Sequence, residues 1–326
     1  MKPVLISTAL ILTLCMLFLP MLASYAEPAP RPPAGSESDV RIGELTGSPG
    51  YFLVKNPESG AVSRVDDSDY VYGVVAGEMN MGYADEALKA QAVAAFTYAC
   101  RKRQTRINGG ADDYDLTSTH VNDQQYLTKD EATKKWGDKA AEYDARLKKL
   151  VSDVAGYVIV YENEPILAVC HAISGGKTET AVNVWGKDYP YLRAVESAGD
   201  LMAPGYTSEK TFTPDQIKES LKTQSIALPD DKSKWFGLSN NSESGMVLSL
   251  PVGDKSLTGR QIRELFELRS SNFTVKYEED QFVFNVYGYG HGVGLSQYGA
   301  QVMALQGNTY VEILSWYYEG CSMKKI

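Results

Sequence analysis

The feature that most restricts the fold is an uncharged, apolar stretch at the N-terminus. Residues 4–23 carry no charge, and Lys2 is the positive residue before them. A small-x-small sequence, typical of a signal-peptide cleavage site, follows at residues 24–26. The stretch is also just long enough to span a bilayer. It therefore predicts export, with segment 1–26 either a retained membrane anchor or a cleaved leader.

The rest of the chain is predicted to be extracytoplasmic, tethered to the membrane or secreted if the leader is cleaved. Residues 27–40 are rich in Pro, Ser and Gly, which predicts a linker. The globular part is then 41–326, a length that suits one large domain or two modest ones. Within it, segment 206–280 is predicted to form a small subdomain.

Charge and cysteine content narrow the class of protein. A formal net charge of −9 argues against a nucleic-acid-binding surface. Hydrophobic residues make up 44% of the chain, so a packed core is expected. Cys15 lies in the apolar stretch, which leaves Cys100, Cys170 and Cys321. These three can form at most one intrachain disulfide, so a disulfide-rich scaffold is excluded.

Local patterns predict an α+β fold. Aromatic and β-branched runs predict strands at 51–54, 70–75, 157–161, 166–169, 246–250, 273–277 and 281–287. Helical spacing predicts helices from 85, at 131–154, 213–224 and 258–268, and from 296 and 311. The helix from Asp85 is alanine-rich, which predicts a buried central helix. Because strands and helices do not alternate strictly, a mixed-sheet core with an inserted small α/β subdomain is favoured over a doubly wound sheet.

The histidines all fall in loop-like sequence. The chain has three, His120, His171 and His291, and each is surrounded by small polar residues or glycines. A lone histidine is usually structural. Three in loops of this type predict that the loops converge on one site.

Glu78 is the candidate acid. It follows the strand predicted at 70–75 and precedes the alanine-rich helix, with Gly77 and Met79 beside it. A carboxyl group in such apolar company is partly desolvated, which suits a general acid. The alternative is a surface glutamate in a loop.

Other catalytic classes have weaker support. The sequence has no G-x-S-x-G elbow, so an α/β-hydrolase is disfavoured. Cys170 and the three histidines are potential zinc ligands, but C-x-x-C and H-E-x-x-H spacings are absent. The glycines of residues 288–294 enclose His291 and match neither phosphate-loop pattern.

Several ordered blocks of the chain are similar to one known family. The blocks are residues 74–79 with 86–95, 118–120 with 125–126, 171 with 174–179, 257–270, and 288–300. The last block, Gly-Tyr-Gly-His-Gly-Val-Gly-Leu-Ser-Gln-Tyr-Gly-Ala, is the most specific. Together they resemble the SpoIID/LytB domain family, named after stage II sporulation protein D, over about residues 51–320.

The resemblance implies a peptidoglycan lytic transglycosylase that cleaves MurNAc–GlcNAc linkages of glycan strands stripped of stem peptides. It implies a role in engulfment during sporulation, beside a cell-wall amidase and a membrane protein. The family's catalytic glutamate falls on Glu78, and no cofactor or metal is implied. The residues implied to bind substrate are His120, Gln125, Tyr126, His171, Ser174, Gly175, Gly176, His291, Ser296, Gln297 and Tyr298.

A lytic transglycosylase requires one well-placed carboxyl group. The acid protonates the glycosidic oxygen, and its carboxylate then takes a proton from the C6 hydroxyl of the sugar, which closes a 1,6-anhydro ring. A glycosidase that hydrolyses the bond would need a second carboxylate at a defined separation. No second carboxylate stands out in the sequence, which is consistent with the one-acid scheme.

Two departures from the family pattern leave other functions open. Many relatives have Arg where this chain has Phe96, which suggests weakened substrate positioning and motivates a non-catalytic glycan-binding or engulfment-scaffold protein as the alternative. Some relatives bind zinc through a Cys before the histidine that matches His120, whereas residues 115–117 here contain no Cys. A zinc hydrolase is the third hypothesis.

Overall fold

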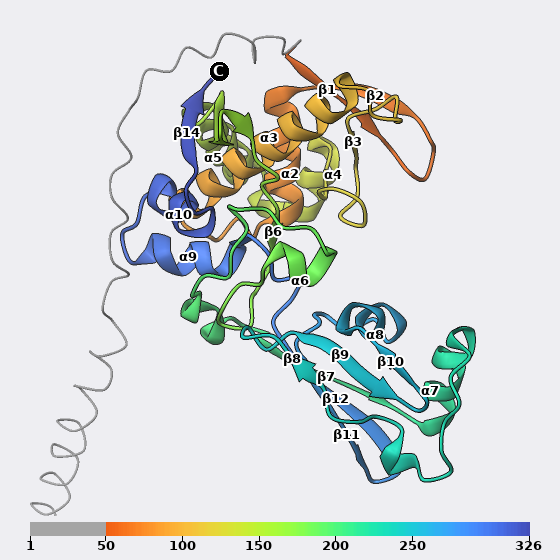
Figure 1. Cartoon of the computed structure of the whole chain (residues 1–326). Coiled ribbons are helices and arrows are strands. Elements are labelled where there is room, and N and C mark those ends of the chain that lie inside the picture. Colours follow the sequence, from red (N-terminus) through yellow and green to blue (C-terminus); the bar gives the residue numbers. More distant parts are fainter. Residues whose placement is uncertain (1–49) are drawn as a thin grey trace, which may run out of the picture. The chain divides into compact units, whose positions relative to one another are not determined.

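The computed structural model describes residues 50–326 (Figure 1). The anchor or leader predicted at 1–26 and the linker predicted at 27–40 lie outside the described residues. Between residues 50 and 326, no helix is both long and apolar enough to cross a membrane. Cys100, Cys170 and Cys321 are free thiols.

Helices and strands are interspersed along the chain, so the predicted α+β class is confirmed (Figure 1). The α-helices are α2 (Asp67–Glu78), α3 (Asp85–Ile107), α4 (Lys129–Trp136), α5 (Ala140–Asp153), α6 (Ala181–Trp185), α7 (Pro214–Leu221), α8 (Gly259–Leu265), α9 (Gln297–Leu305) and α10 (Tyr310–Tyr317). Short 3-10 helices are η1 (Gly137–Lys139), η2 (Ala198–Met202), η3 (Lys222–Gln224) and η4 (Lys232–Lys234).

The strands form several small sheets rather than one large sheet. They are β1 (Tyr51–Lys55), β2 (Val62–Asp66), β3 (Leu116–Thr117), β4 (Tyr157–Tyr161), β5 (Glu164–Pro165), β6 (Cys170–His171), β7 (Thr207–Phe212), β8 (Asn240–Asn241), β9 (Val247–Val252), β10 (Lys255–Leu257), β11 (Phe273–Glu278), β12 (Gln281–Tyr287), β13 (Leu295–Ser296) and β14 (Ser322–Lys325). Their orders are β2-β1-β3, β14-β4-β5, β13-β6, β11-β12-β7 and β10-β9-β8.

The strand predicted at 70–75 was wrong, because this segment belongs to helix α2. Its residues Val71, Val74 and Val75 are buried together with their neighbours, so the helix has almost no polar face over this stretch. A run of β-branched residues without a polar face is easily mistaken for a buried strand. Glu78 is therefore the last residue of a helix and not the end of a strand.

Helix α3 is buried along most of its length, as its alanine content predicted. Small side chains on several faces allow neighbouring helices to approach closely. The helix begins at Asp85, as predicted, and Ala84 is its N-cap. The side chain of Asp85 accepts hydrogen bonds from the neighbouring helix α5.

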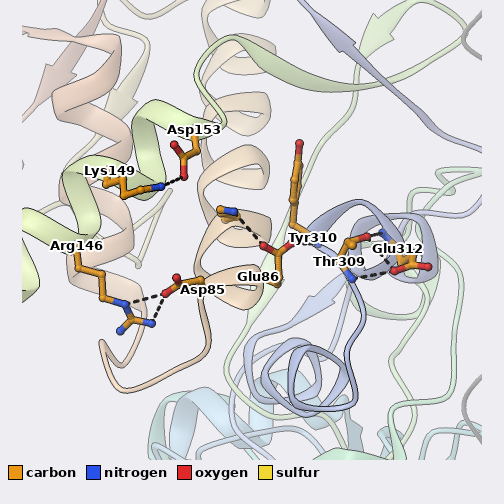
Figure 2. A network of polar contacts seen from close by, with 9 residues as sticks. Asp85, Glu86, Arg146, Lys149, Asp153, Thr309, Tyr310 and Glu312 are labelled. Carbon is orange, nitrogen blue, oxygen red and sulfur yellow. Dashed lines mark hydrogen bonds and ion pairs between the residues drawn. The ribbon is translucent and has the colours of Figure 1, made fainter.

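Arg146 of α5 holds the loop that joins α2 to α3 (Figure 2). Its guanidinium donates to the Asp85 carboxylate at 2.8 and 2.6 Å and to the carbonyl of Tyr83 at 2.6 Å. Next to Asp85, the Glu86 carboxylate accepts from the backbone N–H of Tyr310 at 2.7 Å, which ties α3 to α10 (Figure 2). Because this loop begins directly after Glu78, these contacts fix the backbone beside that residue.

Other local predictions were correct in part. The helix predicted at 131–154 is interrupted at Gly137, which has a φ of 55° and ends α4. Strands β4 and β5 form a hairpin that turns at Glu162 and Asn163, which are both at positive φ. Its second strand is β5, so the strand predicted at 166–169 was wrong.

The parallel pairing of β6 with β13 brings distant parts of the chain together. Cys170 pairs with Leu295, and His171 pairs with Ser296. Gly294, which precedes β13, has a φ of 71°, and a Cβ on it would lie 2.3 Å from the carbonyl oxygen of Val169. Only glycine permits this approach. The glycine-rich loop is therefore placed directly against the segment that carries His171.

Two hydrophobic clusters stabilise the described part. The larger cluster surrounds α2 and α3 and includes β4, α9 and α10 side chains. The smaller cluster lies between β7, β9, β11, β12, α7 and α8, and Phe266, Phe282 and Phe284 are fully buried in it. Helices α7 and α8 each begin with a threonine capping box. The boundaries predicted for the linker and for a subdomain at 206–280 stay predictions.

Candidate functional site

A groove of about 590 Å³ is lined by residues from both halves of the described chain. This volume lies within the usual range of ligand sites, about 300–1,000 Å³. The lining residues include six of the predicted site residues: Glu78, His120, Gln125, His171, His291 and Gln297. Other lining residues are Tyr98, Asp123, Cys170, Trp185, Arg263 and Tyr289. The three predicted histidine loops thus meet at one cavity.

The carboxylate of Glu78 is held by two amide donors. The backbone N–H of Gln125 donates to Oε1 at 2.7 Å, and the side-chain amide of Gln297 donates to Oε2 at 3.3 Å. Glu78 itself remains partly exposed in the groove. The two contacts orient the carboxyl group without supplying a neutralising charge.

Two glycines of α2 make the Gln125 contact possible. A Cβ on Gly77 would lie 2.3 Å from the carbonyl oxygen of Gln125, and a Cβ on Gly73 would lie 2.4 Å from that of Leu127. Real Cβ atoms do not approach backbone this closely, so residues 125–127 pack directly on the helix backbone. The Leu127 N–H donates to the carbonyl of Gly73 at 3.1 Å. The glycines therefore position the donor that holds Glu78.

Lys135 of α4 binds the C-terminal end of α2. Its ammonium donates to the carbonyl oxygens of Ala76 and Gly77 at 2.7 and 3.0 Å. A cation is favourable at this end of a helix, whose last turn contains no basic residue of its own. Burial lowers the pKa of Lys135, and the charge of Glu78 opposes this shift. The contact keeps the end of α2 in place beside the groove.

His171 and His291 lie together with their rings 5.8 Å apart between centroids. The Nδ1 of His171 donates to the carbonyl of Val293 at 3.0 Å, while its Nε2 has no hydrogen-bond partner. The Nδ1 of His291 instead accepts from the Val293 N–H at 3.1 Å. Burial lowers the pKa of His171, and burial with His171 and Arg263 nearby lowers the pKa of His291 to about 3. Both imidazoles are therefore neutral at physiological pH.

His120 and Cys170 line the groove together with Glu78. The Nδ1 of His120 is 3.1 Å from the Oε1 of Gln125, the residue whose backbone holds Glu78. The Cys170 sulfur is within 3.3 Å of the Gln91 amide and 3.9 Å of the Gln297 amide. Burial, reinforced by the charge of Glu78, raises the pKa of the Cys170 thiol to about 12. Cys170 is thus a protonated thiol and a poor nucleophile.

The described residues contain no cluster of side chains that would support the zinc hypothesis. Within residues 50–326, no group of three or more His, Cys, Asp or Glu side chains is arranged to hold a metal ion. Two of the potential ligands, His171 and His291, use one ring nitrogen each for contacts with Val293. These residues do not form the closed tetrahedral set of a structural zinc site.

Ser174 and Ser296, implied to bind substrate, are buried and are not among the lining residues of the groove. Their side chains are buried and both donate to the carboxylate of Asp200, Ser296 at 2.8 Å and Ser174 at 2.5 Å. Ser197 also donates to this carboxylate at 3.0 Å. Short hydroxyl side chains are well suited to satisfy a buried carboxylate. The serines therefore join the loops that carry His171 and Gln297 rather than line the cavity.

The other predicted binding residues lie around the groove but not in its lining. Tyr126 stacks on Tyr70 with ring planes 6° apart, so it packs against α2. Gly175 lines a small neighbouring cavity, and Gly176 is at a φ of 98° and pairs with Ser197. Tyr298 donates to the carbonyl of Met202 at 3.3 Å. Their predicted contact with substrate stays a prediction.

Phe96 lies away from the groove. Its side chain is buried, its ring centroid is 6.1 Å from that of Phe52, and it forms part of a different cavity. The sequence position that departs from the family pattern therefore has no contact with Glu78 in this chain. The expectation that Phe96 weakens substrate positioning stays a prediction, and the placement of Phe96 outside the groove lining gives it no support.

Glu179 joins the α6 region to the turn between β8 and β9. Its buried carboxylate accepts from Ser242 and Ser244 at 2.5 Å each and from the Asn183 amide at 2.8 Å. Thr180 donates as well, from its backbone at 2.7 Å. Burial opposes ionisation, yet these donors hold the pKa of Glu179 below its usual value.

We expect Glu179→Gln to lower the free energy of unfolding at pH 7 by about 1–3 kcal/mol, because it places an amide among hydroxyl donors. A carboxyl group with a lowered folded pKa stabilises the fold above its unfolded pKa of about 4.3. That contribution is lost as the pH falls through the folded pKa. Urea unfolding at pH 7 and pH 3 should thus show a difference between variant and native chain that shrinks at pH 3.

The matched control for this prediction is Glu243→Gln. Glu243 lies between the two serines, but its side chain is 88% exposed and pairs only with Lys177. Its replacement should change the free energy of unfolding by less than about 0.5 kcal/mol. If the free energy of unfolding of Glu179→Gln differed from that of the native chain by the same amount at pH 7 and pH 3, the ionised carboxylate of Glu179 would not be the source of the stabilisation.

Asp123, Trp185 and Arg263 are among the groove residues to which the sequence assigned no role. Asp123 follows the predicted His120 loop, but nothing in its local sequence distinguishes it from other surface aspartates. Trp185 lies with its ring centroid 5.1 Å from that of His291. Arg263 reaches the groove from α8, more than 180 residues after Glu78 in sequence. The similarity block at residues 257–270 included Arg263 but gave it no role.

Comparison with known proteins shows consistent similarity. The family model described as "SpoIID: Stage II sporulation protein" matches residues 55–161. Stage II sporulation protein D of Bacillus subtilis (strain 168) is 34% identical over 284 residues, which cover 86% of this chain and 81% of the relative. Its counterpart in Bacillus amyloliquefaciens is 32% identical over 340 aligned residues, which cover 100% and 96%. The amidase enhancer of Bacillus subtilis is 26% identical over 77% of this chain and 40% of the relative.

Proposed function

Because the chain belongs to the SpoIID family of stage II sporulation proteins, we propose that it is a peptidoglycan lytic transglycosylase of sporulation. Its substrate is glycan stripped of stem peptides, and its products end in 1,6-anhydroMurNAc. The observation that carries this proposal is the carboxyl group of Glu78, held by two amide donors at the edge of a groove of about 590 Å³.

The second carboxylate of the groove supports a one-acid mechanism. Asp123 Oδ1 accepts from the Tyr98 hydroxyl at 2.9 Å and from the Lys102 ammonium at 2.7 Å. Its Oδ2 accepts from the backbone and hydroxyl of Thr117 at 2.7 and 2.9 Å. Both oxygens are therefore occupied, and Asp123 is not free to activate a water molecule as an inverting glycosidase requires.

In the proposed mechanism Glu78 acts in both steps, and its two hydrogen bonds support this role. As the acid, it donates its proton to the glycosidic oxygen as the bond to the leaving sugar breaks. The resulting carboxylate accepts the proton of the C6 hydroxyl, whose oxygen attacks the anomeric carbon. The Gln125 N–H and the Gln297 amide stabilise that carboxylate and orient it between the two steps. The neutral histidines line the groove without adding charge.

We place the protein on the outer face of the membrane, attached through segment 1–26 or secreted after its cleavage. Its proposed partners are the glycan strand, a cell-wall amidase that removes stem peptides beforehand, and a membrane protein of the engulfment machinery. The similarity to an amidase enhancer supports the link to an amidase. No nucleic-acid partner is proposed, given the net charge of −9.

The test is incubation of the full-length chain with amidase-treated glycan strands, with the products measured by mass spectrometry. We expect products lighter than hydrolytic fragments by the mass of one water molecule. Fragments of full hydrolytic mass would overturn the transglycosylase and require a second catalytic group. Bound but intact glycan would favour the glycan-binding or scaffold alternative, although Phe96, which motivated it, lies outside the groove.

A further inference from the structure

Arg263 is an unpaired cation in the groove. Among the groove-lining residues that the structure describes, it is the only Lys or Arg. Its Nε donates to the carbonyl of Leu268 at 3.3 Å, and no carboxylate of the described chain lies within ion-pair distance of it. The side chain is partly buried, and burial lowers its pKa, but an arginine keeps its proton. A partly buried cation is costly unless it is paired, so an anionic ligand would bind favourably beside it.

The surroundings of Arg263 leave its charge available to a ligand. Arg269, the other arginine nearby, is 4.4 Å from the centroid of the Tyr289 ring and stacks on it. Arg260, on the same helix as Arg263, pairs with Glu264 at 3.2 Å on the surface. The two carboxylates that line the same groove, Glu78 and Asp123, form no ion pair with Arg263, and both oxygens of Asp123 are already hydrogen-bonded. Among the described residues Arg263 therefore has no anionic partner, and a ligand in the groove could supply one.

The proposed substrate offers one such anion. A glycan strand of alternating GlcNAc and MurNAc carries acid only at the lactyl ether of MurNAc. That group is a free carboxylate after the stem peptide has been removed, and an uncharged amide while the peptide is attached. We propose that Arg263 binds the free lactyl carboxylate and thereby selects stripped glycan strands. This inference rests on the proposed function.

The chemistry of the two partners fits this selection. The guanidinium presents parallel N–H donors that match a carboxylate, and the pair forms charge-assisted hydrogen bonds. An amide in place of the carboxylate loses the charge and presents an N–H to the cation, while the continuing peptide adds bulk. Stripped glycan is thus preferred because its carboxylate pairs with Arg263, whereas the amide of unstripped glycan leaves this partly buried cation unpaired. Arg263 is a specificity-determining residue in this scheme, and Glu78 remains the acid.

The test measures binding to a full-length Glu78→Gln chain, which cannot consume the ligand. The ligands are a stripped glycan tetrasaccharide and the same tetrasaccharide with its lactyl carboxylates converted to methyl amides. We expect the amide form to bind about 10- to 100-fold more weakly, as loss of a hydrogen-bonded charge pair implies. Adding Arg263→Gln should weaken binding of the acid form by a similar factor and leave the amide form nearly unchanged.

Arg260→Gln in the same background is the matched control, because Arg260 lies on α8 but pairs with Glu264 outside the groove. It should retain the preference for the acid ligand. The comparison of the two ligands on a chain with intact Arg263 does not depend on the folding of Arg263→Gln, so it tests the proposal even if that variant is unstable. Equal affinity of that chain for both ligands would overturn the proposal, as would equal weakening of both ligands by Arg263→Gln.

A separate measurement, the release of anhydro products, tests the proposed function. With Glu78 intact, the Arg263→Gln chain should still release anhydro products from stripped glycan at high substrate concentration, with a raised KM and a largely retained kcat. Anhydro products together with no ligand preference would reject the role of Arg263 alone. Absence of anhydro products from the native chain would reject the lytic function itself.

Discussion

Glu78→Gln is expected to lower the rate of glycan cleavage by about 10²–10⁴-fold, the contribution typical of a positioned general acid. The amide has the size of the carboxyl group but has no proton to donate to the glycosidic oxygen. It also cannot accept the C6 proton in the second step. Release of anhydro products from stripped glycan, measured over a series of enzyme concentrations, reports the loss.

The fold should survive this substitution. The introduced amide would keep an oxygen for the Gln125 N–H, which lies 2.7 Å from the present carboxylate. We expect a midpoint of thermal unfolding close to that of the native chain. Glu142→Gln, on the exposed side of α5, is the control and should retain full activity. Undiminished cleavage by Glu78→Gln would remove Glu78 from the mechanism.

Gly77→Ala is expected to reduce both stability and activity. The added methyl would lie 2.3 Å from the carbonyl oxygen of Gln125, so residues 125–127 must move away from α2. Overpacking of this kind costs about 1–3 kcal/mol of the free energy of unfolding. The displaced Gln125 N–H would no longer orient Glu78, and a misplacement of about 1 Å can lower the rate by about 100-fold.

Gly82→Ala is the matched control for Gly77→Ala. Gly82 lies in the exposed loop after α2, and its added Cβ would meet only the side chain of Asn80, whose oxygen is 3.2 Å away. Urea unfolding and initial cleavage rates should be close to those of the native chain. If Gly77→Ala were as stable and active as Gly82→Ala, the close packing of residues 125–127 on α2 would not be important for the site.

Local sequence was sufficient to predict those helices and strands that depend on residues close together in the chain. The helices predicted to start at 213 and 258, the alanine-rich helix α3 and the strand predicted at 157–161 each depend on neighbouring residues, and the structure has all four. The failure at α2 has a physical cause. A helix buried around most of its circumference has no polar face, so its valines predicted a strand.

The residues of the site were also predicted only in part from the sequence. The histidine loops and Glu78 were identified from residue type and from blocks of family similarity, and they do line one groove. Ser174 and Ser296 belonged to the same blocks, yet they hold the buried Asp200. Similarity between sequences does not distinguish a residue that touches a ligand from one that supports the loop beneath it.

The sequence by itself determined the family, the α+β class and Glu78 as the candidate acid, because these depend on residue types and on spacings within short segments. Only the tertiary structure decided that Phe96 lies outside the groove, that Asp123 is fully hydrogen-bonded and that Arg263 has no carboxylate partner within the described residues. Each of these depends on contacts between residues far apart in the chain. Close packing fixes such contacts only after the whole chain has folded.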